Sequence, residues 1–87
     1  MNGVEIFTIS GYRSIAATSG EDSIAIANGY KAKAKGAKGN YLVLTEYDDD
    51  YNLVAVKSRK VDGKRIKADT YYTLKDGKFT EVTGEGY

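Results

Sequence analysis

The chain contains no cysteine, histidine, proline or tryptophan. Without cysteine it has no disulfide framework and no thiolate nucleophile or metal ligand, which favours a reducing, cytosolic compartment. Without histidine it lacks the commonest general base and the commonest transition-metal ligand. Ser-His and Cys-His nucleophilic sites are therefore excluded. We predict a protein that is not an enzyme, with no catalytic residue, no metal site and no cofactor.

Long apolar runs are also absent. No stretch approaches the ~20 apolar residues that span a bilayer, and the opening residues MNGVEIFTIS lack a basic flank followed by an apolar core. The 87 residues suit a single domain, residues 1–87, with no membrane partner. A domain of this size buries only about 60% of the surface that its unfolded chain exposes, so we expect modest stability.

A nine-residue spacing runs through the first half of the chain. The segments GYRSIAATS, GEDSIAIAN and GYKAKAKGA begin at Gly11, Gly20 and Gly29, and each runs from a glycine into small and apolar residues. Such self-similarity is typical of stacked β-solenoid rungs. We predict a capping strand at 1–9, followed by about three nine-residue rungs at 10–39. The inward positions would be Ile15, Ala17, Ile24, Ile26, Ala32 and Ala34.

The second half predicts an antiparallel β-meander at 40–83, with a tail at 84–87. Alternating apolar and polar residues favour strands at 41–47, 52–61, 70–75 and 78–82. Asp-Gly pairs at 62–63 and 76–77 are strong hairpin signals, because a type I′ turn needs positive φ at both central residues. The predicted fold class is therefore all-β: a short β-solenoid-like repeat packed on a β-meander.

Three stretches, SGYRSIAATSGEDSIAIAN, the junction GYKAKAKGAKGN and VDGKRIKADTYYTLKDGKF, cover most of the chain. On these stretches the chain resembles a C-terminal domain of unknown function in SG-x-x-SAAT repeat proteins of phages and gut bacteria. This resemblance implies a phage or mobile-element setting and no known activity. The piece DSIAIANGYKAKAKG is also similar to the head repeats of trimeric autotransporter adhesins, which stack as parallel β-rolls.

Charge is unevenly distributed along the chain, although the net charge is only +1. Residues 31–40 carry four lysines and no acid, and residues 53–69 carry six cations against two acids. Lysines that alternate with alanines on a strand lie on one face. This pattern favours a partner-binding surface, or alternatively a solvated face that keeps a strand edge from pairing. The predicted binding residues are Tyr30, Lys31, Lys33, Lys35, Lys38, Lys57, Arg59, Lys64, Arg65 and Lys67.

The acidic residues between these stretches offer two weaker patterns. Asp48, Asp50 and Asn52 have the spacing that begins a calcium loop, but the glycine and glutamate that complete such a loop are missing. We therefore favour an acidic hairpin turn. Glu46 with Asp69 is the enzymatic alternative, a carboxylate pair that nothing in its spacing supports.

Three functional hypotheses remain. The leading one is a small non-enzymatic binding protein of phage or mobile-element type, an inhibitor that occupies a host defence protein in the host cytoplasm. The alternative is a structural or capping domain of a phage fibre or surface assembly, acting in the phage particle as a homo-oligomer. The third is nucleic-acid binding through the basic strand faces.

Overall fold

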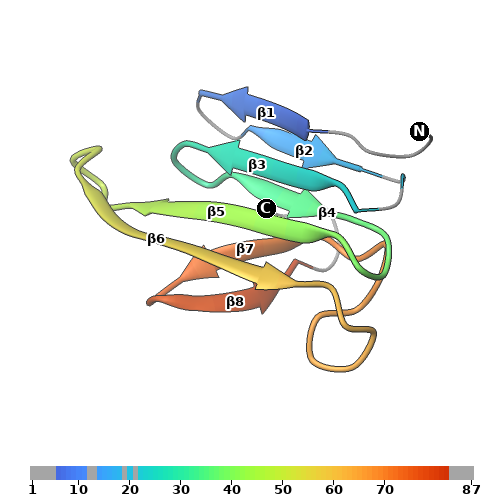
Figure 1. The fold of residues 1–87 in the computed structure, drawn as a ribbon. Helices are drawn as coiled ribbons and strands as arrows, with labels where there is room; N and C mark the ends of the chain where they lie inside the picture. The colour runs from blue at the N-terminus through green and yellow to red at the C-terminus, as the bar shows by residue number, and fades with distance from the viewer. Residues whose placement is uncertain (1–5, 12–13, 19, 21, 83–87) are drawn as a thin grey trace.

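The computed structural model describes residues 6–11, 14–18, 20 and 22–82, with the backbone alone for 6–10. The described residues form strands and no helix, so that part of the chain has no helix able to cross a membrane. The predicted all-β class is thus confirmed. The strands (Figure 1) are β1 Ile6–Ser10, β2 Ile15–Ala17, β3 Ile24–Asn28, β4 Lys33–Lys35, β5 Tyr41–Tyr47, β6 Leu53–Lys60, β7 Tyr72–Lys75 and β8 Lys78–Glu81.

The strands form two facing four-stranded sheets. Sheet A has the order β1-β3-β5-β6 and sheet B the order β2-β4-β7-β8 (Figure 1). The N-terminal pairs β1-β3, β3-β5 and β2-β4 are parallel, whereas β4-β7, β5-β6 and β7-β8 are antiparallel. The chain therefore alternates between the sheets in its first half and closes each sheet with a hairpin strand.

Parallel neighbours lie two repeat units apart. Ile6 pairs with Ile24 in sheet A and Ile15 pairs with Lys33 in sheet B, an offset of 18 residues in both cases. Ile24 then pairs with Tyr41, 17 residues on. One nine-residue unit is thus one strand and one turn, and the chain returns to the same sheet after two units. The structure differs here from the predicted nine-residue rungs, because the coil spans both sheets.

The repeat fills its interior with small side chains. Of the predicted inward positions, Ala32 and Ala34 are buried, but the prediction was wrong for the rest. Ile15 is 49% exposed, Ala17 is exposed, and both Ile24 and Ile26 are only half-buried. Isoleucine is too large for an interior where methyl and hydroxyl groups from the two sheets meet. Among the described repeat residues, those with buried side chains are Ser14, Ala16, Thr18, Ser23, Ala25, Ala27, Ala32 and Ala34, and Gly36 is buried too.

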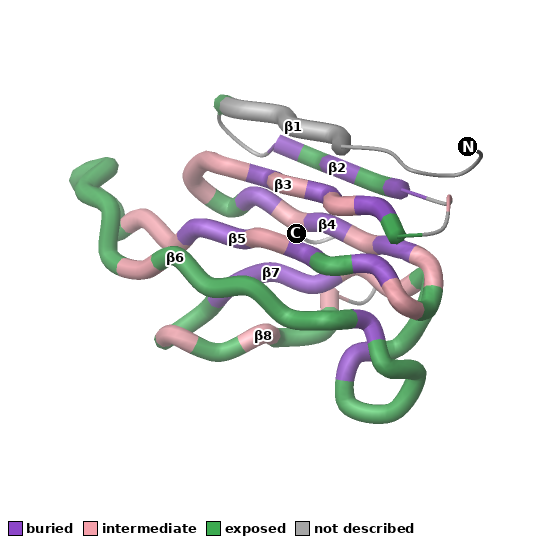
Figure 2. Tube along the Cα trace, viewed as in Figure 1, coloured by how far each residue is buried: buried purple, intermediate pink, exposed green. Residues whose placement is uncertain are grey.

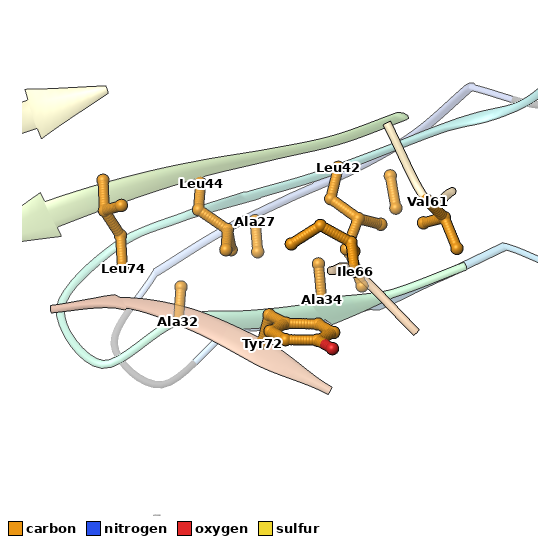
Figure 3. Packing of buried hydrophobic residues seen from close by; sticks show 11 residues of the cluster. Ala27, Ala32, Ala34, Leu42, Leu44, Val61, Ile66, Tyr72 and Leu74 are labelled. Atoms are coloured by element: carbon orange, nitrogen blue, oxygen red, sulfur yellow. The ribbon is translucent and has the colours of Figure 1, made fainter. Parts of the chain in front are cut away.

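The larger core residues lie where the hairpin strands join the coil. Leu42 and Leu44 of β5 face Tyr72 and Leu74 of β7 across the sheets, against the alanine rows (Figure 3). Val61 is fully buried and Ile66 is 6% exposed, at the loop that follows β6. This cluster anchors β5 and β7, whereas most of β6 is exposed (Figure 2).

The predicted meander is two hairpins in different sheets. The Asp76-Gly77 turn joins β7 to β8 with φ of 53° and 76°, as predicted. The Asp62-Gly63 pair instead begins a loop that crosses from sheet A to sheet B. Amide donation from Lys64 and Ile66 lowers the pKa of the Asp62 carboxyl. Residues 1–5 of the predicted capping strand and the tail 84–87 lie outside the described residues.

Candidate partner-binding surface

Two of the predicted lysines share the outer face of sheet B. β4 comprises only Lys33–Lys35, and its alternation places Ala34 inside and both lysines outside. Lys31 lies in the preceding turn with φ of 58°, and Lys38 lies in the loop after the strand. The predicted basic face of four lysines is therefore reduced to two, Lys33 and Lys35. The strand ends at a glycine-containing turn on each side, so Lys31 and Lys38 do not belong to it.

A tyrosine from the distant C-terminal hairpin joins this lysine pair. Ala34 pairs with Tyr72, so Tyr71 lies next to β4 on the outer face. The Lys33 and Lys35 ammonium groups lie 4.7 and 4.9 Å from the centroid of the Tyr71 ring. Both are within the ~6 Å range of cation–π attraction. One aromatic ring therefore holds two cations at a fixed place on the sheet.

An exposed isoleucine extends this surface. The parallel register places Ile15 beside Lys33 on the outer face, and the Ile15 side chain is 49% exposed. Within the described residues, neither lysine forms an ion pair with a carboxylate. We call Ile15, Lys33, Lys35 and Tyr71 the sheet-B surface: an apolar side chain and an aromatic ring beside two cations that have no carboxylate partner in the part of the chain that the structure describes.

The remaining predicted cations lie elsewhere. Lys38 packs its aliphatic stem over Gly63, at the start of the loop that carries Lys64 and Arg65. Lys67 forms an ion pair with Glu81 at 3.6 Å, so part of its charge is neutralised. These loop cations lie outside β4, the strand that carries Lys33 and Lys35.

β6 carries two more of the predicted cations. Lys57 and Arg59 are exposed on this edge strand, and the Arg59 guanidinium lies 5.9 Å from the ring of Phe79. β6 belongs to sheet A, so neither cation belongs to the outer face of sheet B.

Tyr30 and Lys31 line a polar pocket at the turns. The Lys31 ammonium lies 5.6 Å from the Tyr30 ring, and the Tyr30 hydroxyl donates to Asp49 at 2.8 Å. The pocket, of about 520 Å³, mixes both signs of charge, whereas ligand pockets are mostly apolar. Its lining is Tyr30, Lys31, Thr45, Glu46, Tyr47, Asp49, Leu74, Lys75 and Asp76.

The two carboxylates of the enzymatic alternative lie apart. Both Glu46 oxygens accept backbone amides of the β7–β8 turn, from Asp76 and Gly77, each at 2.8 Å. Asp69 donates its backbone N–H to Gly36, beyond the opposite end of β5. The two carboxylates therefore have different neighbours and are not held together as a pair.

The acidic turn between β5 and β6 is a capped hairpin turn. Asp48 Oδ1 accepts the backbone amides of Asp50 and Asn52, both at 2.9 Å. The Asn52 amide is the main cause of the lowered pKa of the Asp48 carboxyl. The described residues contain no group of three acidic side chains placed to hold a metal ion.

Sequence reasoning missed Tyr71 and Ile15 as members of this surface. Tyr71 and Tyr72 are adjacent and alternate between the two faces of the sheet, so Tyr72 is buried, at 3% exposure, and Tyr71 lies on the outer face. The neighbour of Tyr71 depends on the pairing of β4 with β7, which no local pattern reveals. Ile15 is one of the predicted inward positions, whereas its side chain is 49% exposed on the outer face.

Known proteins do not assign a role to this surface. No protein family, curated protein or solved structure matches the chain.

Proposed function

We propose that the chain is a non-enzymatic binding protein that docks an acidic surface of a partner protein on the sheet-B surface. One observation carries this proposal: two lysine ammonium groups share the Tyr71 ring on an outer sheet face. Carboxylates of a partner are the complementary groups, because charge complementarity across an interface guides encounter and register.

The aromatic ring prepares the lysines for binding. A free lysine side chain loses up to ~2 kcal/mol of rotamer entropy when it is fixed in an interface. Cation–π attraction at an exposed site contributes about 0.5–1 kcal/mol for each lysine. Part of the ordering cost is thus met before the partner arrives, which supports affinity through preorganisation.

The composition of the surface favours a protein over a nucleic acid. Tyrosine is enriched at binding hot spots, and Ile15 adds exposed apolar area beside the cations. Nucleic-acid binding relies on many cations along a phosphate backbone. Here Lys57 and Arg59 lie on the other sheet and the remaining predicted cations lie in turns and loops, so only two of the predicted cations, Lys33 and Lys35, belong to the sheet-B surface.

Charge reversal on β4 tests the proposal. The double variant Lys33→Glu and Lys35→Glu should reduce capture of the partner by at least about tenfold, or 1.4 kcal/mol, because each carboxylate contact becomes repulsive. Capture is measured by quantitative mass spectrometry, from a nuclease-treated bacterial lysate, the source that the resemblance to phage and gut-bacterial proteins suggests.

The matched control reverses two charges on the same sheet. Lys75 and Lys78 are exposed and pair with each other across the β7–β8 hairpin. The double variant Lys75→Glu and Lys78→Glu should capture the same protein as the wild type. Equal capture by both double variants would contradict the proposal, and loss of capture after nuclease treatment alone would indicate nucleic acid.

A further inference from the structure

One of the two edges of sheet A, that of β6, is an exposed strand with apolar residues. β6 ends the order β1-β3-β5-β6, and within the described residues no strand pairs with its outer edge. Leu53, Val54 and Val56 are 54%, 58% and 55% exposed. A long exposed apolar edge is a template for pairing with another chain.

The hydrogen-bond phase of β6 limits the pairings available to this edge. The Val61 N–H donates to the Asn40 carbonyl at 2.7 Å, and the Gly39 N–H donates to the Val61 carbonyl at 2.8 Å. Both backbone groups of Val61 thus point toward the β5 side. Along a strand, the backbone N–H and C=O groups of successive residues point alternately to one side and the other. The β5–β6 register is unbroken from Lys60 to Ala55, so this alternation continues through that stretch. The groups of Val56, Ser58 and Lys60 therefore point to the free edge.

The distribution of charge selects one register for two antiparallel copies of β6. The first half of the strand is apolar, whereas the second half carries Lys57, Arg59 and Lys60. A two-fold axis at Lys57 would place two lysines directly opposite each other, and an axis at Ser58 would place Lys57 opposite Arg59. Like charges in such pairs are destabilising.

An axis at Val56 avoids every such pair. It places Val56 opposite its own copy, Lys57 opposite Ala55, and Arg59 opposite Leu53. An axis at Ala55 also avoids them, but it pairs a shorter part of the strand. The Val56 register is therefore the longest overlap without opposed cations.

We propose that β6 pairs antiparallel with β6 of a second copy, with Val56 on the two-fold axis, to give one continuous eight-stranded sheet. The interface is isologous, as in most homodimers. In the single chain, Arg59 donates to the Ser58 carbonyl at 3.1 Å and covers one edge acceptor. Pairing replaces this bond with one from the second copy. The sheet-B surface lies on the other sheet and remains accessible.

Single cysteines test both the edge and the register, because the natural chain has none. In the dimer, the Cα atoms of the two Val56 residues lie ~5.5 Å apart, within the range of a disulfide. The variant Val56→Cys should form a disulfide-linked dimer under mild oxidation. In the control Ser58→Cys, on the same strand and face, the two positions are four residues out of register, on the order of 13 Å, and should cross-link at least tenfold more slowly.

Light scattering provides the second measurement. The wild type should approach twice the monomer mass as concentration rises to the millimolar range, whereas Val56→Lys, which places two lysines on the axis, should stay monomeric with an unchanged circular dichroism spectrum. A wild type that stays monomeric would overturn the proposal, and so would equal cross-linking of the two cysteine variants. If Val56→Lys unfolds, the cysteine comparison alone decides the matter.

Discussion

The substitution Gly29→Ala is expected to destabilise the protein by about 3 kcal/mol or more. Gly29 has φ of 153°, where side chains are strained, and an added Cβ would overlap the carbonyl oxygen of Gly11 in the turn one coil earlier. Backbone strain costs about 1–3 kcal/mol and overpacking a similar amount. A domain of this size has ~4–13 kcal/mol of stability. Thermal unfolding followed by circular dichroism should show a midpoint lower by about 12 °C or more.

The control for this variant separates strain from overlap. Gly39 also has positive φ, 96°, but an added Cβ there meets no atom within 4 Å. Gly39→Ala should therefore cost only the backbone strain, about 1–2 kcal/mol. If both variants lost the same free energy of unfolding, the close approach of Gly29 to Gly11 would be contradicted.

The second large effect is expected at Asn40, a fully buried polar residue in the loop before β5. Its Oδ1 accepts the Ser23 amide and its Nδ2 donates to Thr18 Oγ1, both at 3.0 Å. Thr18 and Ser23 are themselves buried. Removing a buried partner costs about 1–3 kcal/mol for each group left without it. Asn40→Ala should therefore lower the free energy of unfolding by about 2–4 kcal/mol in a urea titration.

Asn28 supplies the comparison for Asn40. It is half-buried, and its side-chain oxygen accepts a hydrogen bond from the Tyr47 hydroxyl, at 2.9 Å. Asn28→Ala should cost about 1 kcal/mol, because water can replace the lost partner. If Asn28→Ala were the more destabilising of the two substitutions, the stabilising role given to the buried hydrogen bonds of Asn40 would be wrong.

The repeat was visible in the sequence, but which of its faces is buried was not. Ile15 is more hydrophobic than Ser14, so hydrophobicity alone assigns isoleucine to the interior. The structure buries Ser14 instead. Its hydroxyl donates a hydrogen bond to the Gly11 carbonyl at 2.6 Å, within the same turn. A hydroxyl that bonds local backbone can be buried at low cost. This bond depends on turn geometry, which period-two alternation does not encode.

Only the part of the candidate surface that lies on one strand, β4, was predicted from the sequence. Alternation of lysine and alanine placed Lys33 and Lys35 on one face, and the structure confirms this placement. Tyr71 reaches them only because β7 pairs with β4, a contact between segments far apart in the chain. The Asp76-Gly77 hairpin was predicted correctly because its turn depends on adjacent residues alone.

The two proposals use different parts of the molecule. Partner binding belongs to the outer face of sheet B, whereas self-association belongs to the edge of sheet A. A dimer through β6 would present two sheet-B surfaces at once. Binding to a partner with two acidic sites would then gain avidity without any new contact within either surface.

Site-specific photo-cross-linking tests the central claim, that a partner protein docks on the sheet-B surface, most directly. A benzophenone amino acid at Ile15 leaves Lys33, Lys35 and Tyr71 intact, and the control position Tyr41 has a similar exposure, 46% against 49%, in sheet A. The account predicts a discrete cross-linked protein from Ile15, lost when Lys33 and Lys35 are both changed to glutamate, and absent from Tyr41. No cross-link from Ile15, or the same product from both positions, would contradict it.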